Sequence, residues 1–206
     1  IEDAVRRGAA AVLAAPGTEV PAPAVLAADP EPRLGLARIA ARFFGEQPRT
    51  IVAVTGTSGK TSIAEFARQL WAALGRPAAS IGTLGIKGPE RADPLVHTTP
   101  DPITLHRALG DLRRAGVDCV AIEASSHGLD QRRLDAVRLA AAAFTNLSRD
   151  HMDYHASAED YLAAKLRLFT AVLPPGGAAV VNADSDKAAA VIAAATKRGQ
   201  KVLTYG

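Results

Sequence analysis

A short apolar strand that leads directly into a glycine-rich turn and a helix restricts most strongly how this chain can fold. Residues 51–54 are apolar and mostly β-branched, and residues 55–62 read Thr-Gly-Thr-Ser-Gly-Lys-Thr-Ser. Glycines let backbone N–H groups converge on an anion, and the helix N-terminus adds a partial positive charge. The turn is therefore predicted to bind phosphate, with the candidate residues Gly56, Thr57, Ser58, Gly59, Lys60, Thr61 and Ser62.

Two side chains of this turn suit a triphosphate in particular. Lys60 would supply a full positive charge, and the hydroxyl of Thr61 is placed to bind a magnesium ion that bridges the phosphates. The common phosphate-loop pattern is missed by one residue, because its first glycine would fall on Val54. The alternative is a plain glycine turn with a surface lysine, but the strand, glycines, lysine, hydroxyls and helix together favour phosphate binding.

Strand and helix patterns alternate from residue 49 to the end of the chain. This alternation predicts an α/β fold with a mostly parallel sheet that helices cover on both faces. Apolar strands are expected at 51–54, 78–81, 117–122, 140–144 and 178–181, and helices at 60–74, 102–114 and 157–173. The first of these helices is expected to bury one apolar face, made of Ile63, Phe66, Ala67, Leu70, Trp71 and Leu74. The second is expected to bury Leu105, Leu109 and Leu112, and the third to begin at a capping box formed by Ser157 and Asp160.

The first 48 residues differ from the rest of the chain. They are too few to bury much core alone, so we expect them to be the end of another α/β domain. The proline-rich stretch 16–32 is read as connecting chain or an edge strand, and a helical pattern follows at 36–43. Since the chain begins with Ile1, it is expected to be a fragment, with a domain remnant at 1–48 and an incomplete central domain at 49–206.

Composition excludes several classes of protein. The chain is 48% hydrophobic with a net charge of only +3, which argues against disorder and against nucleic-acid binding. One cysteine, Cys119, cannot form an internal disulfide, so a reducing, cytoplasmic compartment is expected. A run of about 18 apolar residues would be needed to span a membrane, and the sequence contains none, so no membrane insertion is expected.

An acidic residue, Glu123, ends the predicted strand 117–122. The carboxyl ends of parallel strands border the crevice in which such sheets bind ligands, so this acid could hold magnesium near the phosphate loop. A helix N-cap or a solvated strand end is the alternative. Further along, Arg133 suits a carboxylate or phosphate because its guanidinium donates two parallel hydrogen bonds.

Three residues of the last third are ambiguous from sequence alone. His151 and His155 could be zinc ligands, but no third His or Cys stands at metal spacing. Lys165 lies at the border of the apolar stripe of its helix, so its stem is expected to pack while its ammonium reaches water. Asn182 and Asp184 follow a predicted strand and could meet a nucleotide base.

Four motifs in this order resemble those of the Mur ligases, which assemble the stem peptide of peptidoglycan. The run at 55–61 is similar to their ATP loop. The others are Thr-Thr-Pro-Asp at 98–101, Glu-Ala-Ser-Ser-His-Gly-Leu at 123–129 and Ala-Ala-Lys at 163–165, the last downstream of His151. The motif at 123–129, together with Gln131 and Arg133, resembles that of the muramyl-tripeptide synthetase branch of this family. The resemblance covers nearly the whole chain and implies a P-loop-type α/β central domain.

By this resemblance, the protein would be an ADP-forming ligase that uses ATP and Mg²⁺. It would add meso-diaminopimelate or L-lysine to UDP-N-acetylmuramoyl-L-alanyl-D-glutamate through an acyl phosphate. The implied catalytic residues are Lys60, Glu123, His151 and Lys165; the magnesium ligands are Thr61, Glu123, His151 and Lys165 as a carbamate. Substrate contacts would come from Thr98, Thr99, Ser125, Gln131 and Arg133, and ATP contacts from the loop and Asn182.

Two other classes stay open. The chain could be a different phosphate-loop enzyme, such as a kinase or a folylpolyglutamate-type ligase, although the run at 125–128 argues against both. It could instead be a nucleotide-binding module without catalysis, which the intact loop, acid, histidine and lysine disfavour. The resembling enzymes also have a C-terminal domain that closes over ATP. Because this chain stops at Gly206, we expect it to have negligible ligase activity alone.

Overall fold

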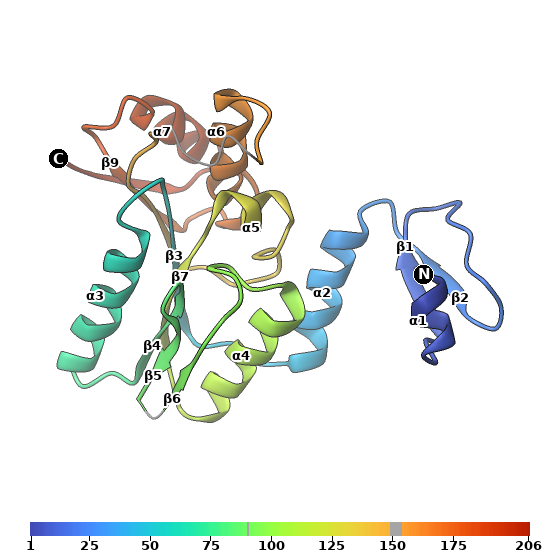
Figure 1. Ribbon diagram of the computed structural model, residues 1–206. Helices are drawn as coiled ribbons and strands as arrows, with labels where there is room; N and C mark the ends of the chain where they lie inside the picture. Colours follow the sequence, from blue (N-terminus) through green and yellow to red (C-terminus); the bar gives the residue numbers. More distant parts are fainter. Residues whose placement is uncertain (90, 149–153) are drawn as a thin grey trace.

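The computed structural model describes residues 1–89, 91–148 and 154–206 and is built around an eight-stranded sheet (Figure 1). The strand order is β10-β9-β8-β3-β7-β4-β5-β6. Neighbours from β10 to β4 run parallel, and β5 and β6 are added antiparallel at one edge. The predicted mostly parallel α/β sheet is therefore confirmed. Its strands are β3 (Thr50–Thr55), β4 (Ala78–Gly82), β5 (Gly85–Gly88), β6 (Arg91–Asp93), β7 (Cys119–Glu123), β8 (Ala141–Phe144), β9 (Ala178–Asn182) and β10 (Lys201–Tyr205).

Successive side chains of a strand point to opposite faces of the sheet, and helices cover both of these faces. In β3, Ile51 and Ala53 belong to the larger core cluster together with Leu105 and Leu109 of helix α4, whereas Val54 faces helix α3. The expected burial of the α4 leucines is confirmed, since both are fully buried. Figure 1 shows α3 and α4 on opposite sides of the strands. The helices around the sheet are α3 (Lys60–Ala73), α4 (Pro102–Arg114), α5 (Ser126–Asp130), α6 (Ala158–Arg167) and α7 (Ala188–Lys197).

The face that α3 presents to the sheet differs from the predicted one. Ala64 is buried, and Ala67 and Trp71 pack beside it on the sheet. The two alanines allow a close approach between helix and sheet, and Trp71 packs beside them, whereas the other large apolar residues lie on the outer face. The prediction was wrong for four of them: the exposed fractions are 36% for Ile63, 60% for Phe66, 65% for Leu70 and 75% for Leu74.

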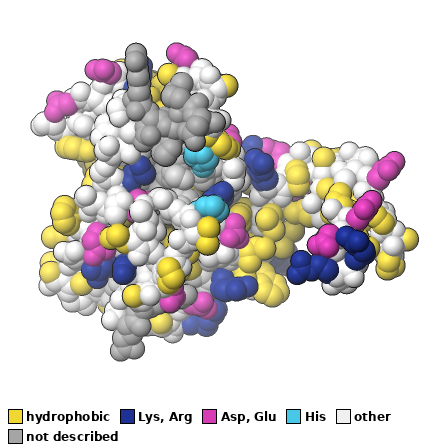
Figure 2. All heavy atoms as spheres, viewed as in Figure 1, with side chains coloured by type: hydrophobic (Ala, Val, Ile, Leu, Met, Phe, Trp, Pro, Cys, Tyr) yellow, Lys and Arg dark blue, Asp and Glu magenta, His cyan; other side chains and the backbone are white. Residues whose placement is uncertain are grey.

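The first 48 residues form a small unit beside the main sheet. Helix α1 (Glu2–Arg6) precedes a parallel pair, β1 (Ala11–Ala14) and β2 (Val25–Ala28), and the latter is the strand expected in the proline-rich stretch. Helix α2 (Pro32–Phe44) contacts both β1 and α4. Figure 2 shows apolar side chains gathered over α2, where Phe43 is 81% exposed. The proposed domain boundary at residue 48 stays a prediction.

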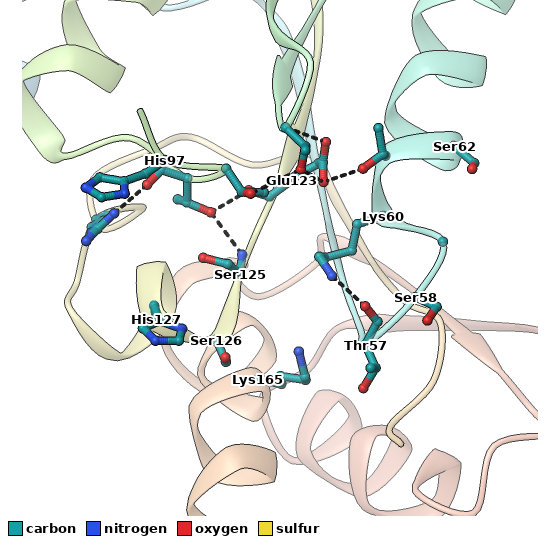
Figure 3. Close-up of a pocket in the computed structure, with 16 residues that line it drawn as sticks. Thr57, Ser58, Lys60, Ser62, His97, Glu123, Ser125, Ser126, His127 and Lys165 are labelled. Carbon is teal, nitrogen blue, oxygen red and sulfur yellow. Dashed lines mark hydrogen bonds between the residues drawn. The ribbon is translucent and has the colours of Figure 1, made fainter. Parts of the chain in front are cut away.

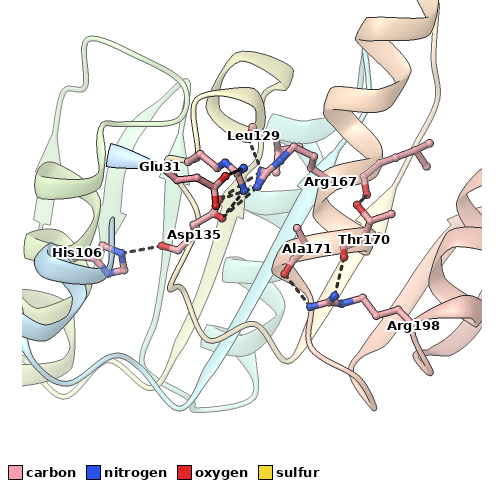
Figure 4. A network of polar contacts seen from close by, with 10 residues as sticks. Glu31, His106, Leu129, Asp135, Arg167, Thr170, Ala171 and Arg198 are labelled. Carbon is pink, nitrogen blue, oxygen red and sulfur yellow. Dashed lines mark hydrogen bonds and ion pairs between the residues drawn. The ribbon is translucent and has the colours of Figure 1, made fainter. Parts of the chain in front are cut away.

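The predicted helix at 157–173 is present but changes its geometry. Its N-cap is confirmed, because the Ser157 hydroxyl accepts a hydrogen bond from the backbone N–H of Asp160 at 3.0 Å. The α-helical part ends at residue 167, and Leu168–Val172 continue as a π-helix. Arg198 donates to the backbone carbonyls of Thr170 and Ala171, so two carbonyls of this irregular turn have partners (Figure 4). Among the described helices, none is both long and apolar enough to cross a membrane.

A partly buried charged network ties α6 to the end of α5 and the segment after it (Figure 4). Arg167 of α6 donates to the backbone carbonyl of Leu129 at 2.7 Å and pairs with the carboxylate of Asp135 at 3.2 Å. Burial raises the pKa of Asp135, while the two guanidinium groups of Arg167 and Arg132 oppose that shift. Arg132 also pairs with Glu31. The network therefore connects α6, the 129–135 segment and the N-terminal unit.

A second partly buried ion pair lies on α3 and gives a prediction about acid stability. Arg68 donates to the Glu65 carboxylate and lowers the pKa of Glu65 from 4.5 to about 2, and Ser80 adds a hydrogen bond from β4. The folded-state pKa of Glu65 is depressed, so its carboxylate contributes fully to the free energy of unfolding above the unfolded-state pKa. This contribution is lost as the pH falls through about 2. Glu65→Gln should lower the free energy of unfolding at pH 7 by about 1–2 kcal/mol.

Urea unfolding followed by circular dichroism at pH 7 and pH 2 would check this. The difference between wild type and variant should shrink at the lower pH. Glu159→Gln is the matched control, since this glutamate is exposed on α6. An equal difference at both pH values would contradict the assigned role of the Glu65 charge.

Candidate functional site

A cavity of about 770 Å³ lies at the carboxyl ends of the central strands (Figure 3). Residue pairing explains this convergence: Val54 in β3 lies opposite Glu123 in β7, and Ile81 in β4 lies opposite Ile122. The loops after these three strands therefore open at the same edge of the sheet. The cavity is lined by Thr57, Ser58, Gly59, Lys60, Thr61, Ser62, Thr83, His97, Thr98, Thr99, Glu123, Ser125, Ser126, His127, Arg133 and Lys165.

The predicted phosphate loop joins β3 to the N-terminus of α3. Gly59 has a φ of +88°, which glycine adopts without strain. At Gly56, a Cβ would overlap the side chain of Thr145, so that position needs glycine for space as well. The segment after β8 fixes the loop, because Thr145 donates to the backbone carbonyl of Ser58 at 2.7 Å and Asn146 accepts from its N–H at 3.0 Å. These hydrogen bonds hold the loop in its shape.

Two lysines from distant parts of the sequence converge on this loop. Lys60 Nζ donates to the carbonyls of Gly56 and Thr57 at 2.9 and 2.8 Å. Lys165 Nζ, from α6, donates to the same Gly56 carbonyl at 2.9 Å and lies 4.3 Å from the ring centroid of Tyr161. Lys165 is only 1% exposed, so the expectation that its ammonium reaches water was wrong. Two cationic groups beside a turn of backbone N–H groups favour an anionic ligand.

Glu123 is buried at the end of β7, with 2% exposure, so it is neither a solvated strand end nor a helix cap. Its carboxylate accepts hydrogen bonds from the Thr61 hydroxyl at 2.9 Å and from the N–H and hydroxyl of Thr83 at 2.8 and 3.1 Å. Figure 3 shows it between the phosphate loop and the segment that carries His97. A carboxylate and a hydroxyl side by side are the oxygen ligands that Mg²⁺ prefers, so the donor set fits this ion.

The predicted substrate residues meet on the other side of Glu123. The Thr99 hydroxyl donates to the backbone carbonyl of Glu123 at 2.7 Å and accepts from the N–H of Ser125 at 2.9 Å. Arg133 donates to the backbone carbonyl of Thr99 at 2.7 Å, and Gln131 accepts from Arg133 at the same distance. Gln131 does not line the cavity itself but orients the arginine that does.

The described structure leaves the predicted roles of Asn182 and His151 untested. Asn182 ends β9 and does not line the cavity; its side-chain oxygen accepts from the N–H of Asp184 at 3.1 Å. Its ATP contact stays a prediction. His151 lies outside the described residues, so its predicted metal role stays a prediction as well. Within residues 1–89, 91–148 and 154–206, no group of three His, Cys, Asp or Glu side chains gathers as a metal site.

Four lining residues were missed from the sequence: Thr83, His97, Ser126 and His127. His127 packs on Tyr154 with their ring centroids 3.7 Å apart. Thr83 had a usable signal, because it lies two residues after the predicted strand 78–81, and the carboxyl ends of such strands border ligand sites. The order of the strands, which places β4 next to β7, was not evident from the sequence.

The mostly parallel sheet, the glycine-rich loop after β3 and the buried acid at the end of β7 define an α/β domain of the phosphate-loop type. The chain belongs to the Mur ligase family, because residues 54–206 match the Mur ligase middle domain. UDP-N-acetylmuramoyl-L-alanyl-D-glutamate–2,6-diaminopimelate ligases from Rhizobium meliloti (strain 1021) and Mesorhizobium japonicum are 56% and 58% identical over 206 and 207 residues. The matches cover 100% and 99% of this chain but 42% of each relative, so the chain spans well under half of their length.

Solved structures agree with this assignment. A structure of a ligase with the same name superposes with a TM-score of 0.87 at 36% identity, covering 99% of this chain and 42% of the other. The E. coli FolC structure in complex with DHPP and ADP gives a TM-score of 0.66 at 16% identity over 84% of this chain and 46% of that chain. At that identity, the second likeness shows a shared fold alone.

Proposed function

We propose that this chain carries the ATP and nucleotide-sugar site of a ligase that adds a diamino acid to UDP-N-acetylmuramoyl-L-alanyl-D-glutamate. The observation that supports this most is one cavity lined by the phosphate loop, Glu123, Arg133 and Lys165 together with residues 98–99. The names of the similar ligases favour 2,6-diaminopimelate as the diamino acid. The complete reaction is proposed for a protein as long as these ligases, in which this chain is joined to the remaining part. We place it in the cytoplasm, the compartment that supplies ATP.

Residues of the phosphate loop would bind the triphosphate of ATP. Its backbone N–H groups and Lys60 would hold the γ-phosphoryl group and balance its charge while it is transferred. The Thr61 hydroxyl and the Glu123 carboxylate would hold Mg²⁺. When bound, this ion would neutralise part of the phosphate charge.

The second substrate would bind at residues 98–99, Ser125 and Arg133, across Glu123 from the loop. A carboxylate oxygen of its D-glutamate would attack the γ-phosphorus, and ADP would leave. The amine of the diamino acid would then attack the acyl carbon, so that phosphate leaves and an amide forms with loss of a proton. Activation is needed because a carboxylate is a poor electrophile.

Lys165 is proposed to act as a carbamate. Its ammonium would first lose one proton. The neutral amine would then add to carbon dioxide: a nitrogen–carbon bond would form as one carbon–oxygen double bond opens, and a second proton would be released, so that a cation is replaced by an anion. The position of Lys165 supports this proposal, because its side chain is buried beside Gly56 and Tyr161 and lines the same cavity as Thr61 and Glu123. With His151, it would complete a second magnesium site.

Product analysis separates the open functions. The protein at its natural length should form ADP only when ATP, Mg²⁺, UDP-N-acetylmuramoyl-L-alanyl-D-glutamate and a diamino acid are all present. Parallel reactions with 2,6-diaminopimelate and L-lysine would identify the diamino acid. ADP formation with a folate and L-glutamate instead would favour the folylpolyglutamate-type alternative. Tight ATP binding without turnover on either substrate set would favour a nucleotide-binding module.

A further inference from the structure

We propose that Thr83 is a positioning residue that holds the Glu123 carboxylate in the orientation needed to bind Mg²⁺ beside the phosphate loop. The proposal rests on the proposed function, since it concerns the cation of the same nucleotide site. Thr83 supplies two of the three hydrogen bonds described above for this carboxylate, one to each oxygen: its N–H donates to Oε1 at 2.8 Å and its hydroxyl to Oε2 at 3.1 Å.

The residue before Thr83 provides the space for this arrangement. A Cβ at Gly82 would overlap Oε1 and the adjoining carbons of Glu123. Gly82 does not have a positive φ, so the position needs glycine for room and not for its backbone conformation. Gly82 and Thr83 together form a cradle at the end of β4: the first makes room for the carboxylate and the second supplies its donors.

The cradle has a consequence for how a cation could bind. Burying a carboxylate costs free energy unless its oxygens accept hydrogen bonds, and each oxygen can accept about two. Oε2 accepts from both Thr61 and Thr83. A cation held by Thr61 and Glu123 would replace the bond between them. The two bonds from Thr83 would stay, so the carboxylate would not have to reorient as the ion binds.

The same hydroxyl reaches the predicted substrate segment. Thr83 Oγ1 lies 3.1 Å from Thr98 Oγ1. A hydroxyl has one proton, and that of Thr83 is given to Glu123, so Thr98 must be the donor in this pair. The oxygen of Thr98 is then left as an acceptor facing the cavity that it lines. Thr83 thus fixes the direction of two hydrogen bonds, the one it donates to Glu123 and the one it accepts from Thr98.

Nucleotide affinity with and without the metal tests this role in the protein at its natural length. Calorimetric titration with ADP in Mg²⁺ and in EDTA should show that Thr83→Val weakens Mg²⁺-dependent binding by about 10–100-fold. Metal-free ADP affinity should change by less than about twofold, because Thr83 is not part of the phosphate loop. Thr83→Ser keeps the hydroxyl and should bind like the wild type, and Thr83→Ala should behave like Thr83→Val even if the branched valine disturbs folding.

Thr104→Val is the matched control. It removes a threonine–carboxylate hydrogen bond of the same kind, to Asp101 at 2.6 Å, outside the cavity. Loss of affinity by the same factor with and without Mg²⁺ would mean a merely structural role and would overturn the proposal. So would Thr83→Ala binding Mg²⁺–ADP like the wild type. A wild-type protein without any Mg²⁺-dependent ADP binding would instead overturn the proposed function, and the positioning role with it.

Discussion

Lys60→Ala is expected to lower ligase turnover by about 10²–10³-fold, because removing one preorganised donor from a charged transition state costs this much in other enzymes. Lys60 Nζ lies over the loop, within 2.9 Å of two of its carbonyls, and lines the cavity in which the phosphates would sit. ADP affinity should fall as well, since a full positive charge is lost from the anion site. Coupled ADP-release kinetics and calorimetry would measure both effects.

The fold should survive this change. The Gly56 carbonyl that accepts from Lys60 also accepts from Lys165, so that acceptor keeps a partner. Circular dichroism and thermal unfolding should therefore resemble the wild type. Lys197→Ala, at an exposed position on α7, is the control and should retain turnover. Unchanged ADP affinity in Lys60→Ala would refute phosphate binding by this turn and would leave a plain glycine turn.

The strand, turn and helix around residues 55–62 could be predicted from the sequence because this arrangement is local. Strand, glycines, lysine and helix are adjacent in the chain, and their geometry depends little on the remaining fold. Glu123 could be predicted to border the same site because parallel strands align their carboxyl ends. The burial of Leu105 and Leu109 followed from helical periodicity in the same local way.

What could not be predicted depends on which elements are neighbours. The periodicity of α3 showed an apolar face but not that the alanine side, with Ala64, would be the one against the sheet. Thr83 gained its contacts with Glu123 only because β4 lies beside β7. Lys165 was expected at a helix border, yet α6 packs so that its ammonium reaches Gly56, 109 residues away in the sequence.

The second substitution with a large expected effect is Lys165→Met, which should lower turnover far more than it lowers stability. Methionine is close in length, so it can keep the contact with Tyr161. The hydrogen bond from Lys165 is lost, but the Gly56 carbonyl keeps Lys60 as a donor, so we expect the free energy of unfolding to fall by about 1–3 kcal/mol. Turnover should nevertheless fall at least about 10²-fold, because the proposed carbamate would be missing from the cation site.

Lys165→Arg distinguishes a carbamate from a cation at this position. Arginine retains the positive charge but stays protonated in proteins, so it cannot add carbon dioxide. If the carbamate is required, both variants should be inactive, and native mass spectrometry of the wild type should show the added mass of one carbon dioxide, lost on acidification. Lys201→Met, on the exposed edge strand, should keep activity and stability. Substantial turnover in Lys165→Arg would show that the site needs a cation there, which would refute the carbamate and the second magnesium site built on it.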